Sequence, residues 1–140
     1  MLNTIYPAID RMQQREQGQI AIMSSLAGFR GLPGAPAYSA SKAAARTYGQ
    51  AFRGALQNHK INVSVVCPGF VDTRMTERNQ FPMPLLMDAE RAASIILRGL
   101  QANKPMIAFP AASHFLSWFV GILPNRLTDP LLNAMPNKYD

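Results

Sequence analysis

The stretch GQIAIMSSLAGFRGLPGAPAYSASKAAARTYGQAFRGALQ, residues 18–57, decides the fold class. It opens with a short apolar run between a glycine and two serines, which predicts a buried strand. A loop rich in glycine and proline follows, and a helical pattern then extends from Ala37 to about Gln57. A buried strand, a loop and a helix in this order are typical of a parallel sheet covered by helices.

The flanking segments continue the same alternation. Residues 2–15 have apolar side chains at helical spacing, and INVSVVCPG and PMIAFP indicate two further buried strands. Asp88 is predicted to cap the helix AERAASIILRGLQANK, with its isoleucines facing inward. Residues 72–87 are predicted to form a long loop, and residues 111–136 two short helices separated by Pro124. The chain is therefore expected to have an α/β fold with about three parallel strands and flanking helices.

Composition excludes several function classes. The 140 residues carry a net charge of +6, but the basic residues are scattered and do not form the clustered stripe of a nucleic-acid surface. His59 and His114 lack neighbouring cysteines or paired carboxylates, so no metal site is expected. A single cysteine, Cys67, forms no intrachain disulfide, and we expect it to be a buried, inert thiol in a reducing, cytoplasmic compartment.

Tyr38 and Lys42 lie one helical turn apart and so share a helix face. This spacing alone does not distinguish a solvated helix surface from a proton donor. A phenol is a poor acid or base at neutral pH, because its ordinary pKa is about 10, and a neighbouring ammonium favours the phenolate. Ser25 follows the preceding strand, where parallel sheets place their ligands. We therefore expect Ser25 and Tyr38 to meet at one edge of the sheet.

Residues 22–44, IMSSLAGFRGLPGAPAYSASKAA, resemble the catalytic stretch of the short-chain dehydrogenase/reductase family, with its Y-x-x-x-K motif. Ser25 lies thirteen residues before Tyr38, as in that family, and VSVVCPGFVDTRM resembles the P-G-x-V-x-T segment. The resemblance covers residues 1–110 and implies the C-terminal half of a Rossmann-like, doubly wound parallel sheet. Residues 111–140 correspond to a variable helical tail.

The resemblance implies hydride transfer between NAD or NADP and a small carbonyl or alcohol substrate of apolar character. Tyr38 would act as the general acid or base, Lys42 would assist it and hold the nicotinamide ribose, and Ser25 would bind the substrate oxygen. The residues implied along the cofactor are Tyr38, Lys42, Pro68, Gly69, Val71 and Thr73. Those implied beside the substrate are Ser25, Leu26, Phe29 and Met75.

The chain departs from the family pattern in the cofactor half. It has no glycine-rich G-x-x-x-G-x-G turn, and Gly28, Gly31 and Gly34 follow a different spacing beside prolines that lack amide donors. The family's catalytic asparagine is also unmatched. We therefore expect weak NAD(P)H binding by this chain alone and an unpaired outer edge on the strand at residues 19–24. The choice between NAD and NADP is not encoded in these residues.

Two alternatives to an oxidoreductase remain open from the sequence. The chain could be a non-catalytic binding module, or a membrane-associated module that uses the apolar run FLSWFVGIL, which is half the length of a bilayer span. Packing of that run on the protein is the favoured alternative. In either an enzyme or a binding module, helices 2–15 and 37–57 are expected to form a homo-oligomer face, with a stripe of Ala40, Ala44, Tyr48, Ala51 and Ala55. The apolar residues of loop 72–87 either fill the core or cover the substrate.

Overall fold

The structure is a computed structural model that describes residues 1–74, 76 and 83–134. Within them the order of helices and strands is as the sequence predicts. The elements are α1 (Leu2–Gln14), β1 (Gly18–Met23), η1 (Leu26–Gly28), α2 (Pro36–Leu56), η2 (Gln57–His59), β2 (Ile61–Pro68), α3 (Ala89–Gln101), β3 (Met106–Phe109), α4 (Ala111–Ile122) and α5 (Asn125–Asn133).

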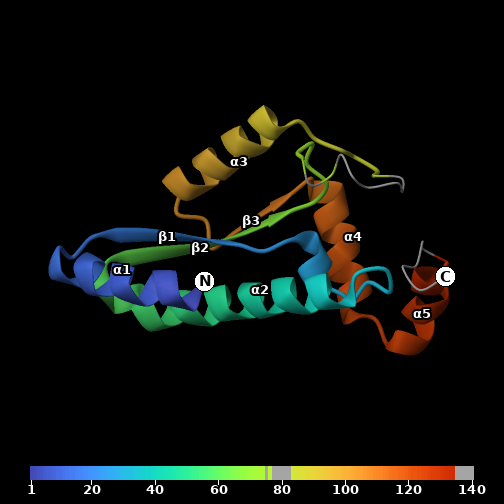
Figure 1. The fold of residues 1–140 in the computed structure, drawn as a ribbon, viewed down its shortest axis with the longest axis horizontal. Helices are drawn as coiled ribbons and strands as arrows, with labels where there is room; N and C mark the ends of the chain where they lie inside the picture. The colour runs from blue at the N-terminus through green and yellow to red at the C-terminus, as the bar shows by residue number, and fades with distance from the viewer. Residues whose placement is uncertain (75, 77–82, 135–140) are drawn as a thin grey trace.

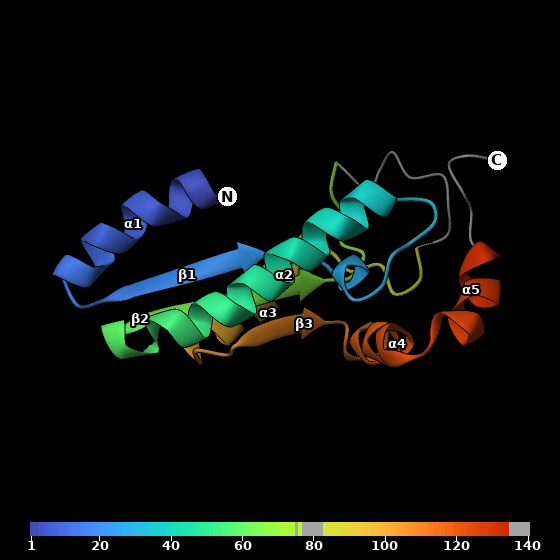
Figure 2. The same cartoon turned by 90° about the horizontal axis from the view of Figure 1, so that it is seen from below.

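The three strands form one parallel sheet in the order β1-β2-β3, which confirms the predicted fold class. Figures 1 and 2 show α1 and α2 along one face of the sheet and α3 on the other. The α1/α2 side contains a cluster that includes Ile5, Ile9, Ile20 and Ile22. The α3 side contains Val66, Ile107 and Phe109, with Ile95, Ile96 and Leu100 packed against them. The predicted inward face of α3 is therefore confirmed.

Local sequence signals account for several helix ends. Pro36 lies in the first turn of α2, where its missing amide hydrogen is not needed. The Asp88 carboxylate accepts a hydrogen bond of 2.6 Å from the backbone amide of Arg91, as predicted for an N-cap. The short helix η1 was not predicted, and it occupies the start of what reads as a loop.

The outer side of β1 has no strand partner among the described residues, as expected from the sequence. Ile20 and Ile22 point into the core, whereas Ala21 and Met23 on the opposite face are exposed. The small residues of α2 are also on its outer surface: Ala40, Ala44, Ala51 and Ala55 are exposed, and Tyr48 is half-buried against Phe52. Oligomer formation through this surface stays a prediction.

The last two helices lie beyond the carboxyl end of the strands (Figure 1). α4 packs on η1 and β3, so one face of this helix packs on the protein, which was the favoured alternative for the run FLSWFVGIL. Its other face exposes large apolar side chains, namely Phe115, Leu116, Trp118, Phe119 and Ile122. Among the described residues, no helix is both long and apolar enough to cross a membrane.

Candidate active site

The carboxyl ends of the three strands are joined by hydrogen bonds just beyond the sheet. The Ser24 amide donates to the Val66 carbonyl at 2.8 Å, and the Gly69 amide donates to the Phe109 carbonyl at 2.7 Å. Between them, the Ser25 hydroxyl donates to the Pro68 carbonyl at 3.4 Å. Because ligands of open α/β folds bind at this edge, Ser25 is placed where a substrate group is expected.

Ser25 is fixed by its position as the cap of η1. Its hydroxyl oxygen accepts a hydrogen bond of 3.2 Å from the Ala27 amide, while its own proton is directed at Pro68. The bond to Pro68 is long for a hydroxyl donor, for which 2.7–2.8 Å is usual. The Ser25 hydroxyl can therefore exchange this hydrogen bond for one to another acceptor at little cost in free energy.

Lys42 connects the start of α2 to the end of β1. The Ser24 hydroxyl donates to the Lys42 carbonyl at 2.7 Å, and the Lys42 ammonium donates to the Met23 carbonyl at 3.4 Å. These two contacts place the Lys42 side chain beside the strand that leads into Ser25. Lys42 of the sequence motif thus lies where α2 contacts the carboxyl end of β1.

Tyr38 lies one turn before Lys42, with its ring beside the ammonium. The distance from the Lys42 Nζ to the centroid of the Tyr38 ring is 5.5 Å, within the range of a cation–π contact. Tyr38 is 41% exposed, so its side chain is accessible from solvent.

An isolated β-bridge and several hydrogen bonds hold the segment after β2 in place. Val71 pairs with Met87 in an isolated parallel bridge, and the Asp72 amide donates to the Met87 carbonyl at 2.8 Å. The Thr76 hydroxyl accepts from the Thr73 amide and donates to the Val71 carbonyl, at 2.8 Å each. Thr73 itself is exposed, whereas the Gly69 amide is already bonded to Phe109.

The predicted substrate residues have different surroundings. Leu26 is buried in a cluster with Val65 and Cys67. Phe29 lies edge-on against His114 at 5.4 Å, with the Arg46 guanidinium 4.6 Å from its ring centroid. Met75 lies outside the described residues. Substrate contact by these three residues therefore remains a prediction.

Cys67 is completely buried, as expected for an inert thiol. Burial raises the pKa of the Cys67 thiol, and the Ser24 side chain and the Arg46 charge act more weakly in the opposite direction. A raised pKa leaves less thiolate, which is the nucleophilic form.

Two arginines near the site were not identified from the sequence. Arg46 donates from Nε to the Gly28 carbonyl at 3.2 Å, and Arg30 donates to Thr128 and Asp129 on α5. Arg46 follows Lys42 by one helical turn, but this spacing says nothing about a partner in the loop. Arg30 and its partners are separated by almost one hundred residues, which no local pattern could reveal.

Comparisons with known proteins show the family of this chain. The family model described as short chain dehydrogenase matches residues 1–82. An uncharacterized oxidoreductase of Myxococcus xanthus is 36% identical over 126 residues, which cover 90% of this chain and 50% of the relative. An uncharacterized oxidoreductase of Mycobacterium tuberculosis is 32% identical over 129 residues, with coverages of 89% and 49%. The chain thus spans about half the length of the curated relatives it matches.

A solved structure resembles most of the chain. It is a short chain dehydrogenase from Burkholderia cenocepacia in complex with NADP, with a TM-score of 0.79 and 25% sequence identity. The similarity covers 96% of this chain and 54% of that one.

Proposed function

Because the chain belongs to the short chain dehydrogenase family, we propose that it carries the proton-transfer part of an NAD(P)-dependent oxidoreductase site. The reaction would interconvert a carbonyl and an alcohol. The observation that supports this proposal most directly is the position of Lys42. Its ammonium lies 5.5 Å from the Tyr38 ring centroid and donates to the Met23 carbonyl, on the strand that leads into Ser25. The matching oxidoreductases and the NADP complex of a relative support the same proposal.

Tyr38 is the proposed general acid and base. In the reducing direction its hydroxyl donates a proton to the oxygen of the substrate carbonyl, and in the oxidising direction its phenolate accepts the proton of the alcohol. The Lys42 ammonium, 5.5 Å from the centroid of the Tyr38 ring, is proposed to offset the negative charge that develops on the Tyr38 oxygen during proton transfer. Ser25 holds the same substrate oxygen by transferring its hydrogen bond from the Pro68 carbonyl, a bond that is already long at 3.4 Å.

The described residues fit the nicotinamide end of the cofactor. An ammonium has three donors, and the described acceptor of the Lys42 ammonium is the Met23 carbonyl, so donors remain for ribose hydroxyls. Thr73 is exposed beyond the end of β2 and can reach a phosphate oxygen or an amide. When bound, the cofactor supplies or accepts the hydride. The Gly69 amide already donates a hydrogen bond to the Phe109 carbonyl. Gly69 is therefore proposed to line the cofactor site without donating to the cofactor.

Apolar character is the proposed selectivity of the substrate side. Leu85 and Leu86 are 57% and 45% exposed in the segment that precedes α3, whereas Met87 is buried in the core. We therefore assign core packing to Met87 and substrate cover to the two leucines. An apolar substrate body would lower the exposed area of both leucines, which favours its binding.

The test is Tyr38→Phe, compared with Tyr6→Phe on the exposed surface of α1. Both are made in a longer protein that also contains a cofactor-binding half, because weak NAD(P)H binding is expected of this chain alone. Rates are measured with NADPH and the best substrate from a panel of ketones and aldehydes. We expect Tyr38→Phe to lower kcat by roughly 100-fold or more, because proton transfer by a positioned side chain contributes about that factor. NADPH affinity, measured by fluorescence titration, should stay unchanged. An unchanged kcat would refute the role of Tyr38.

A further inference from the structure

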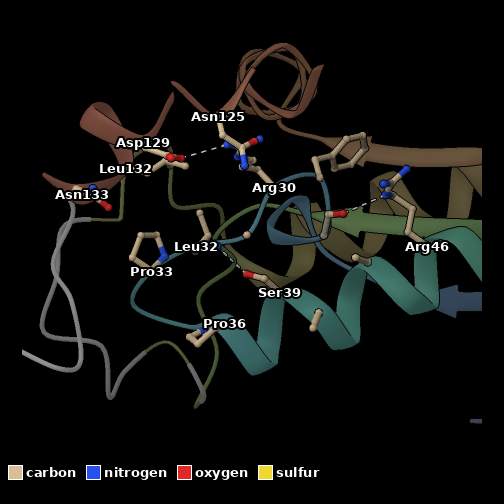
Figure 3. Close-up of a pocket in the computed structure, with 15 residues that line it drawn as sticks. Arg30, Leu32, Pro33, Pro36, Ser39, Arg46, Asn125, Asp129, Leu132 and Asn133 are labelled. Carbon is tan, nitrogen blue, oxygen red and sulfur yellow. Dashed lines mark hydrogen bonds and ion pairs between the residues drawn. The ribbon is translucent and has the colours of Figure 1, made fainter. Parts of the chain in front are cut away.

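A shallow pocket lies beside the loop that joins Ser25 to Tyr38. It has a volume of about 630 Å³, is open to solvent, and is lined by that loop, the first half of α2, and α5 (Figure 3). Neither Ser25, Tyr38 nor Lys42 lines it, whereas Phe29, one of the predicted substrate residues, does. Its volume is within the range of about 300–1,000 Å³ that is usual for small-molecule sites.

Hydrogen bonds fix the walls of this pocket in place. Arg30 donates to the Thr128 hydroxyl and, at 3.4 Å, to the Asp129 carboxylate, which ties the loop to α5. On the α2 side, the Leu32 amide donates to the Ser39 hydroxyl at 3.2 Å. Thr128 and Leu132 are buried, so α5 is seated firmly on the loop. These contacts connect the loop to both helices that line the pocket.

The lining combines an apolar wall with an excess of positive charge. The apolar part includes Phe29, Leu32, Pro33, Pro36, Ala40, Ala43 and Leu132. The charged lining residues are Arg30, Arg46 and Asp129, and the Arg30–Asp129 ion pair cancels one positive and one negative charge. The uncompensated charge of this lining is that of Arg46.

Arg46 is held so that its charge faces the pocket without an acidic partner. Its Nε donates to the Gly28 carbonyl at 3.2 Å, one Nη donates to the Gln50 side chain at 3.4 Å, and Phe29 stacks beneath it. These partners are all neutral, and no ion pair of Arg46 is found in the described part of the chain. Figure 3 shows Arg46 at one end of the pocket, with Pro33 and Asn133 at the other.

We propose that this pocket binds a monocarboxylate with an apolar body, such as a medium-chain fatty acid. The carboxylate binds Arg46 at one end of the pocket, and the apolar body lies on the wall formed by the loop, α2 and Leu132. A single negative charge neutralises the single uncompensated positive charge of the lining. The proposal is independent of the proposed oxidoreductase function, because none of the residues assigned to proton transfer takes part.

The test uses sodium decanoate as the probe, with decanol as its uncharged counterpart, in isothermal titration calorimetry and backbone-amide NMR. We expect saturable binding of one decanoate per chain, with amide shifts centred on Leu32 and Ala43. Decanol should bind roughly tenfold more weakly, because a hydrogen bond to a charged group contributes more than a neutral one. NADPH should not compete with decanoate. This makes the result separable from any failure of the active-site proposal.

Matched variants locate the binding site. Ala40→Phe fills the pocket from an exposed position and should weaken decanoate binding at least tenfold, whereas Ala51→Phe, farther along the same helix and outside the pocket, should not. Arg46→Gln should weaken binding of decanoate but not of decanol, and Arg46→Lys should restore most of it. Equal binding of decanoate and decanol would overturn the proposal, as would shifts confined to α4 or to an interface between two copies. So would unchanged binding in Ala40→Phe.

Discussion

Gly28 and Lys42 are in such close contact that a Cβ atom added at position 28 would lie 2.8 Å from the Lys42 carbonyl carbon. The neighbouring atoms are all backbone, namely the carbonyl group of Lys42 and the amide nitrogen of Ala43. This contact seats η1 on α2. Since Ser25 caps η1 and Lys42 extends from α2, the same contact sets the distance between the two halves of the candidate active site.

Gly28→Ala is therefore expected to impair turnover. Backbone atoms cannot move aside, so the methyl group must lift η1 from α2 and displace Ser25 relative to Tyr38 and Lys42. We expect kcat to fall by about tenfold to 100-fold, because small misplacements of reacting groups are costly. Gly31→Ala is the matched control, since nothing lies within 4 Å of a Cβ at position 31. Equal rates for the two variants, measured with the same substrate and NADPH, would contradict the positioning role of Gly28.

Two glycines of α2 should respond to alanine in opposite ways. A Cβ at Gly49 would lie 2.5 Å from Val65 Cγ2, whereas one at Gly54 would meet nothing within 4 Å. Alanine has a higher helix propensity than glycine by about 1 kcal/mol, so Gly54→Ala should raise the free energy of unfolding by about 0.5–1 kcal/mol. Gly49→Ala should lower it by about 1–2 kcal/mol, because overpacking outweighs propensity. Urea denaturation followed by circular dichroism measures both, and stabilisation by Gly49→Ala would show that α2 is not packed closely on β2.

Cys67 should make the stability of the fold depend on pH in the alkaline range. Burial raises the pKa of the Cys67 thiol in the folded state, so the folded protein disfavours the thiolate more than the unfolded chain does. The stabilising contribution is fully present below the ordinary thiol pKa of about 8.5 and is lost as the pH rises through the folded-state value.

The measurement compares the free energy of unfolding of the natural protein with that of Cys67→Ala between pH 7 and pH 10. Other titrating groups affect both proteins, so the difference between them isolates the thiol. We expect the advantage of the natural protein over Cys67→Ala to shrink above about pH 8.5, by at most about 1.4 kcal/mol per pH unit. A difference independent of pH would show that the thiol titrates normally in the folded state.

The outer edge of β1, which has no strand partner in the described sheet, predicts that copies of the protein form assemblies larger than a dimer. This strand has no partner on its outer side within the described sheet, and Ala21 is exposed at its centre. Lysine on an exposed edge strand disfavours strand pairing between molecules. Ala21→Lys should therefore reduce the formation of species larger than a dimer, which sedimentation velocity at high protein concentration measures.

Ala51→Lys on the outer surface of α2 provides the comparison for this experiment. If helices α1 and α2 form the homo-oligomer face, Ala51→Lys should convert dimers to monomers. It should not affect larger assemblies that form by strand pairing at the edge of β1. Loss of all association in Ala51→Lys alone would assign the whole effect to the helices and contradict the role of the strand edge.

Local patterns in the sequence predicted most of the elements. Buried strands appeared as short apolar runs, α3 was identified from Asp88 and its apolar spacing, and both C-terminal helices were separated correctly at Pro124. These features depend on interactions within a few residues, such as capping, helical periodicity and the conformational limits of proline. The Ser25, Tyr38 and Lys42 motif could be read for the same reason, because its three residues lie on one strand–loop–helix unit.

Only the tertiary structure decided what surrounds that unit. The Arg30 contacts with α5, the packing of Phe29 on His114 and the close approach of Gly28 to Lys42 join segments whose separation in the sequence carries no periodic signal. The uncompensated charge of Arg46 became visible only when its neighbours proved to be a carbonyl, an amide and an aromatic ring. The sequence by itself determined the elements, which local backbone preferences encode, and the spacing of Ser25, Tyr38 and Lys42 along one strand–loop–helix unit. The pocket beside them depends on long-range packing, which the folded chain alone specifies.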